Sequence, residues 1–85
     1  MLSYFPWQYS KFDLAEMKEI EQIGKNIRKY RLKNKFTQLD LAAASGFEES
    51  SIGRIENGHT NPTIKTLLKI AKALDVKLID LVNFK

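Results

Sequence analysis

The sequence predicts an all-α fold of five helices, and three observations lead to that prediction. No segment alternates apolar and polar residues with the period of two that a half-buried β-strand needs. Apolar residues instead recur every three or four positions along most of the chain after residue 12. Capping residues and glycines separate these periodic stretches, as expected at the ends of helices.

The first helix is expected from about Asp13 to Asn34, as one helix or as two that abut at Gly24. Asp13 is a suitable N-cap, and Glu16 stands where it would complete a capping box. An apolar stripe with a period near 3.6 residues follows. Its members are Leu14, Met17, Ile20, Ile23, Ile27 and Tyr30.

Residues 1–12 precede that helix and have no helical period, and Pro6 interrupts them. They are unusually aromatic: the set is Tyr4, Phe5, Trp7, Tyr9 and Phe12. Such a segment either packs on the domain or on a partner, or forms a disordered leader.

Four shorter helices are expected after residue 36. Thr37 caps a helix over 38–45, with Asp40 at its third position, and Gly46 supplies the left-handed backbone of a sharp turn. The next helix begins at Glu48 or Glu49 and ends with Glu56 before Asn57 and Gly58. A fourth begins at Pro62 or Thr63 and ends near Leu74, and a fifth spans about Lys77 to Val82.

The second and third helices have the spacing of a helix-turn-helix. Two crossing helices need small residues where they touch, and Ala42 and Ala43 lie at mid-helix. Four apolar residues are spaced to point together into the core beneath, namely Leu41, Phe47, Ile52 and Ile55. The alternative is an ordinary corner of a five-helix bundle, which would leave the coincidence of Thr37 and Gly46 unexplained.

Composition narrows the function classes. The chain has no cysteine, a single histidine (His59) and a net charge of +4, so no thiolate chemistry or cysteine-based zinc site is expected. Neither a signal pattern nor an apolar run near the roughly 20 residues of a membrane span is present, so a cytoplasmic protein is expected. Charge is unevenly distributed: residues 21–36 sum to +5 and residues 37–58 to −3. Basic segments therefore flank the helical pair. They could contact DNA phosphates beside the pair, or they could simply be lysine-rich helix faces exposed to solvent.

From Ile23 to Val82 the chain resembles the phage-repressor/Cro family of helix-turn-helix regulators, often called the XRE family. The resemblance is carried by IGKNIRKYR, TQLDLAAASG and SIGRIENGHTNPTIKTLLKIAKALDV. It implies a lambda-repressor-like DNA-binding domain at 21–85, preceded by an extension at 1–20 that the family pattern does not cover.

The resemblance also implies roles for individual residues. Base edges would be contacted by Glu48, Glu49, Ser50 and Arg54. Phosphates would be contacted by Gln38, Ser51, Asn57, Gly58, His59 and Thr60. Arg31 and Glu56 would form a largely buried ion pair.

Physical reasoning supports some of these roles and leaves others open. Arg54 is the only basic residue between 37 and 58, and it either pairs with a guanine edge or forms an ion pair in solvent. Glu48 and Glu49 depart from the usual neutral or basic helix start: they could read cytosine N4, weaken nonspecific binding, or indicate a protein partner. Asn57 and Gly58 also serve simply as a helix stop.

A sequence-specific transcriptional regulator that binds double-stranded DNA as a homodimer is the main hypothesis, with no cofactor, metal, membrane or small-molecule ligand expected. The chain resembles small controllers of phage, toxin–antitoxin and restriction–modification systems alike. The predicted dimer face comprises Leu78, Ile79, Leu81, Val82 and Phe84, with the aromatic arm as a possible addition. The alternative is an antitoxin-like protein-interaction module. An enzyme is not expected, because no nucleophile–base pair or phosphate loop is present.

Overall fold

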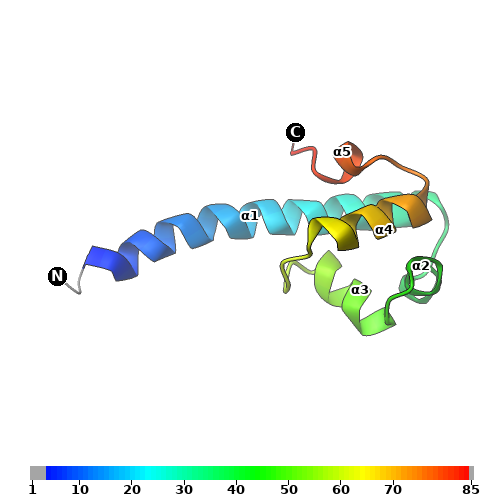
Figure 1. Cartoon of the computed structure of the whole chain (residues 1–85), viewed down its shortest axis with the longest axis horizontal. Helices are drawn as coiled ribbons and strands as arrows, with labels where there is room; N and C mark the ends of the chain where they lie inside the picture. Colours follow the sequence, from blue (N-terminus) through cyan, green and yellow to red (C-terminus); the bar gives the residue numbers. More distant parts are fainter. Residues whose placement is uncertain (1–3, 85) are drawn as a thin grey trace.

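The computed structural model describes residues 4–84, with side chains from residue 17 onward, and within that range it contains helices and no strand. Five helices follow one another along the chain (Figure 1): α1 (Tyr4–Lys33), α2 (Gln38–Ser45), α3 (Glu49–Glu56), α4 (Ile64–Leu74) and α5 (Leu78–Leu81). No helix in the described part is both long enough and apolar enough to span a membrane.

Helix α1 is one continuous helix and starts earlier than the sequence predicts. Asp13 and Glu16 lie inside it, so the expected N-cap and capping box at these positions are wrong. The prediction fails because proline breaks a helix only beyond its first turn. Pro6 stands in the first turn of α1, where a backbone N–H has no intrahelical acceptor and its loss costs nothing. The aromatic side chains of residues 4–12 lie outside the described set.

Gly24 is a contact point and not a weak point of α1. It is buried, and the helix is unbroken through it. A Cβ atom added to Gly24 would lie 2.5 Å from the carbonyl oxygen of Ile55 and 2.6 Å from that of Glu56. Only a glycine therefore allows α1 to lie this close to the last turn of α3.

The α2–α3 corner begins with the cap that the sequence predicts. The Thr37 hydroxyl accepts from the Asp40 N–H at 3.0 Å, and the Thr37 N–H donates to the Asp40 carboxylate at 2.8 Å. Gly46 ends α2 with φ +80°, in the left-handed region. Ala42 is buried, whereas Ala43 is exposed, so only one of the two alanines lies at the helix crossing.

One hydrophobic core joins all five helices. Its buried members are Ile27, Leu41, Ala42, Ile52, Ile55, Leu67, Ile70, Ala71, Leu74 and Leu81. Phe47 is only partly buried and packs at the edge of this core. The core thus fixes α3 from beneath and leaves its opposite side in solvent.

Helix α5 has four residues and is held by burial and by one polar side chain. Leu81 is fully buried, so its assignment to a dimer face is wrong: it packs inside its own protomer. The Asn26 amide on α1 donates to the carbonyl oxygens of Leu81 and Asn83, at 2.9 Å each. This clamp fixes the C-terminal segment against α1, and no periodicity in the sequence points to it.

Candidate nucleic-acid interface

The outward side of α3 carries the predicted base-contacting residues. Glu48 is the N-cap of α3, and Glu49, Ser50 and Arg54 follow in the helix; all four are exposed. Ser51 is half-buried at the side of the helix. The structure therefore places these side chains where a ligand outside the protomer can reach them.

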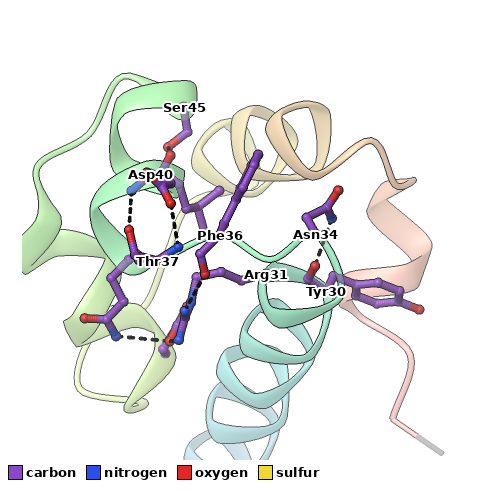
Figure 2. A network of polar contacts seen from close by, with 10 residues as sticks. Tyr30, Arg31, Asn34, Phe36, Thr37, Asp40 and Ser45 are labelled. Carbon is purple, nitrogen blue, oxygen red and sulfur yellow. Dashed lines mark hydrogen bonds and ion pairs between the residues drawn. The ribbon is translucent and has the colours of Figure 1, made fainter.

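A buried ion pair anchors the inner side of α3 to α1. Arg31 Nε donates to Glu56 Oε2 at 2.6 Å, and Arg31 Nη2 donates to Glu56 Oε1 at 3.0 Å. The two side chains are 8% and 1% exposed. Arg31 also donates through Nη1 to the carbonyl oxygen of Phe36 at 2.9 Å, just before α2 begins (Figure 2). A bidentate pair of this kind fixes orientation as well as distance.

Gln38 extends the same network from the first turn of α2. Its Nε2 donates to Glu56 Oε1 at 3.1 Å, so one carboxylate ties α1, α2 and α3 together. Gly53 lies beneath this side chain: a Cβ there would be 3.5 Å from Gln38 Oε1. Gln38 thus passes over Gly53 at the distance of an ordinary van der Waals contact, which leaves room for a methyl group.

A surface groove of about 260 Å³ runs between α3 and the start of α4. Its polar lining consists of hydroxyl groups, one guanidinium and one amide, from Ser51, Arg54, Thr60, Thr63, Thr66 and Asn61. Thr63 is the N-cap of α4 and accepts from the Thr66 N–H at 3.1 Å. Hydroxyls, a guanidinium and a helix N-terminus together suit an anionic ligand. The sequence indicates Thr63 only as a possible first residue of the fourth helix, and it gives no sign that Thr66 lines the groove.

The loop after α3 packs against α1. Gly58 has φ +73°, and a Cβ there would lie 2.9 Å from Glu21 Cγ. Asn57 lines a second groove, of about 320 Å³, together with Lys25 and Arg28 of α1. His59 is exposed and Thr60 half-buried. Basic side chains of α1 therefore flank the loop in which phosphate contacts are predicted.

The helix-turn-helix family model matches residues 27–81, which is more than half of the chain. The chain belongs to the helix-turn-helix family.

Relatives of this helix-turn-helix protein are named as regulators. It is 37% identical over 61 residues to an uncharacterized HTH-type transcriptional regulator, y4dJ, of Sinorhizobium fredii, covering 72% of this chain and 79% of that protein. It is 36% identical to control protein C.SmaI of Serratia marcescens, covering 78% of this chain and 79% of that protein. Among solved structures, the restriction-modification controller protein C.AhdI of Aeromonas hydrophila has 31% identity and a TM-score of 0.74, covering 75% of this chain and 97% of that one.

An antitoxin also matches the helix-turn-helix chain, but more weakly. Antitoxin HipB of Escherichia coli is 25% identical over 72 residues, covering 85% of this chain and 77% of that protein. The matches therefore favour a transcriptional regulator over an antitoxin.

The predicted dimer residues of this helix-turn-helix protein lie away from α3, around α5 (Figure 1). Ile79 is 66% exposed and Phe84 46% exposed. Leu78 and Val82 are half-buried, and Leu81 belongs to the core. Four of the five predicted residues thus retain some exposed surface.

Proposed function

We propose that this chain is a sequence-specific DNA-binding transcriptional regulator that places α3 in the major groove. The observation that carries the proposal is the support beneath α3. Glu56, the last residue of that helix, bonds to Arg31 of α1 and Gln38 of α2, while Ser50 and Arg54 remain exposed. A helix held rigidly on one side and free on the other suits groove insertion.

Base readout is assigned to the exposed residues of α3. The Arg54 guanidinium matches guanine O6 and N7 in the major groove, a contact that contributes about 1–3 kcal/mol of discrimination. Glu48 and Glu49 are hydrogen-bond acceptors, and a carboxylate in the groove selects cytosine N4. Ser50 can donate or accept and adapts to either partner.

Phosphate contacts are assigned to both flanks of α3. On one side the hydroxyl-lined groove offers Ser51 and Thr60 to a backbone phosphate. On the other, Asn57, Gly58 and His59 lie on the loop, and Gln38 lies at the start of α2. Contacts on two flanks would set the orientation of the helix in the groove.

The proposal includes a homodimer formed through Leu78, Ile79, Val82 and Phe84. Exposed apolar side chains at Ile79 and Phe84 support it, because such a patch on a small domain marks an interaction site. Two copies of α3 would then address the two halves of a near-palindromic operator.

Selection of binding sites from random duplex DNA, followed by two substitutions, tests the proposal. Arg54→Ala should relax the preference at one base position, while Gln38→Ala should weaken binding to all sequences about equally. Lys72→Ala, an exposed basic residue on α4, is the control for loss of charge. Melting curves of Gln38→Ala separate lost contacts from lost stability, since Gln38 also bonds Glu56. If both substitutions leave binding unchanged, the contact assignment is wrong.

A protein-interaction module is the second candidate, and the exposed carboxylates of Glu48 and Glu49 are the observation that favours it. Salt dependence distinguishes the two, because a protein that contacts several phosphates loses affinity steeply as salt rises. Absence of binding to a randomised duplex pool at low salt would support the second candidate.

A further inference from the structure

Two partly apolar grooves connect α1 to the C-terminal segment. One groove, of about 280 Å³, is lined by Ile20 and Ile23 of α1 together with Phe84, Glu19 and Asn61. A second groove, of about 560 Å³, is lined by Ile79, Val82, Asn83 and the same Phe84. We call the apolar surface formed by Ile20, Ile23, Ile79, Val82 and Phe84 the α1–α5 face. Because Phe84 belongs to both grooves, this face continues the proposed dimer surface onto α1.

The first half of α1 leaves the domain beside this face (Figure 1). Thirty helical residues span about 45 Å. The molecule measures 51 Å along its longest axis and only 26 and 19 Å along the others. The N-terminal half of α1 therefore projects beyond the other described helices. Its sequence contains Tyr4, Phe5, Trp7, Tyr9 and Phe12.

The projecting half cannot cover the α1–α5 face of its own protomer. α1 is unbroken from Tyr4 to Lys33, so its first half points away from the domain and cannot fold back onto α5. Whatever covers the face must come from outside the protomer. A second copy of the chain can provide the cover. Each protomer has one projecting helix half, which can lie on the partner's face, and one α1–α5 face, which can receive the partner's helix.

Charge is compatible with the same pairing. Residues 1–18 contain two basic and two acidic residues and sum to 0. The remainder of the chain, which includes Glu19 of the groove on α1, carries twelve basic and eight acidic residues and sums to +4. A neutral arm is not repelled by the partner's domain, whereas two domains of like charge repel each other.

We propose that in the homodimer the N-terminal half of α1 of each copy docks on the α1–α5 face of the other copy. This inference rests on the proposed homodimer and adds the arm to it. The contact is isologous: the arm of one protomer lies on the partner's face, and the partner's arm lies on the first protomer's face. The aromatic arm thus becomes part of the dimer interface of a DNA-binding protein.

The chain provides its own probe for this contact, because Trp7 is its single tryptophan and lies in the arm. Emission of the full-length protein is recorded over a dilution series, with sedimentation measured on the same samples. The arm contact predicts that the emission maximum moves to longer wavelength as dimers dissociate, because the indole then enters water.

Two aspartate substitutions sharpen the experiment. Phe84→Asp should raise the dimer dissociation constant about tenfold or more and shift Trp7 emission at concentrations where the unsubstituted protein is dimeric. Leu39→Asp is the matched control: Leu39 is 59% exposed on α2, outside the face, and its substitution should change neither readout. Both positions are exposed, so neither substitution opens the core.

The outcomes separate this inference from the proposed function. A dimer whose Trp7 emission is solvent-like at all concentrations overturns the arm contact and leaves the dimer and DNA binding intact. Protected emission in a monomer also overturns it, since the arm would then be buried within one protomer. A protein that is monomeric throughout overturns both the arm contact and the homodimer.

A mixed disulfide gives an independent check, because the chain has no cysteine of its own. Protein with Tyr9→Cys is mixed with protein carrying Phe84→Cys and oxidised. A disulfide between the two species is expected, and it should be absent when Leu39→Cys replaces Phe84→Cys. Equal yields with both partners would overturn the proposed contact.

Discussion

The Glu56 carboxylate holds α3 in position against α1 and α2. It accepts hydrogen bonds from Arg31 and Gln38 and is almost fully buried. Glu56→Ala would leave the Arg31 guanidinium buried without its partner, which costs about 3–5 kcal/mol. We therefore expect the free energy of unfolding, measured in urea, to fall by that amount.

Glu49→Ala is the matched control for Glu56→Ala. Glu49 belongs to the same helix but is exposed, so its loss should change stability by no more than about 0.5 kcal/mol. Equal losses for the two variants would contradict the role assigned to the buried pair.

Substitution by alanine should have opposite effects on stability at two helical glycines, Gly24 and Gly53. Gly24→Ala places a methyl group 2.5 Å from the Ile55 carbonyl oxygen, and we expect it to destabilise the fold by about 1–3 kcal/mol. Gly53→Ala meets its nearest neighbour, Gln38 Oε1, at 3.5 Å, an ordinary contact. Alanine at Gly53 should therefore stabilise α3 by up to about 1 kcal/mol. Thermal unfolding of both variants measures the difference, and shifts of the same sign would refute this explanation.

At the residue scale, the sequence predicted a pair of interacting side chains, but it did not predict contacts between a residue and the backbone of another helix. The resemblance indicated that Arg31 and Glu56 pair, and the structure has the pair at 2.6 Å. It gave no sign that Gly24 receives the backbone of α3, because a pattern of side chains says nothing about where another helix's carbonyl groups lie. Asn26 was missed for a similar reason: its acceptors are backbone oxygens more than fifty residues away.

At the scale of elements, the start of α2 has a pH-dependent cap. The Thr37 backbone N–H, and secondarily its hydroxyl, hold the pKa of Asp40 below its ordinary value of 3.8. A lowered pKa means that ionised Asp40 stabilises the folded state above pH 3.8 and that this contribution disappears as pH falls through the folded-state pKa.

Asp40→Asn should consequently be less stable than the unsubstituted protein at neutral pH, because a neutral acceptor binds the Thr37 N–H more weakly. The difference should shrink well below pH 3.8, where Asp40 is protonated. Urea unfolding at several pH values measures it. Glu49→Gln, at an exposed position of α3 outside the α1–α5 face, reports the effect of net charge. A difference that does not vary with pH would show that the cap does not depend on ionisation.

The helix boundaries show what local signals in the sequence can and cannot decide. The cap at Thr37 and the turn at Gly46 could be predicted, because each depends on neighbours within four residues. For the fourth helix the sequence left Pro62 and Thr63 as alternative starts, and the structure has Thr63 as the N-cap. The beginning of α1 was misjudged, since Pro6 breaks a helix only beyond its first turn. The assignment of Leu81 to the surface was also wrong. A four-residue helix is too short for periodicity to tell its buried side from its exposed side.

At the scale of the whole molecule, the two proposed binding surfaces meet only at Asn61, which lines both the groove beside α3 and the groove on α1. In Figure 1, α3 lies on one side of α1 and α5 on the other. DNA on α3 and a second copy on the α1–α5 face can therefore be bound at the same time. The sequence predicted the surface of α3 and the C-terminal part of the α1–α5 face. It predicted neither the contribution of Ile20 and Ile23 to that face nor the single continuous helix, α1, that connects the domain to the aromatic arm.

Simultaneous binding makes the spacing of DNA half-sites a strict requirement. A dimer of fixed geometry presents its two α3 helices about 34 Å apart, one turn of DNA. On a selected operator, inserting about five or about ten base pairs between the halves should reduce affinity to that of one half-site, because a rigid dimer cannot span the longer distance. Fluorescence anisotropy at fixed salt measures the loss. Ile79→Asp, which removes an exposed apolar side chain of the α1–α5 face, should bind all three duplexes alike. If the unsubstituted protein binds them equally, its two copies act independently on DNA.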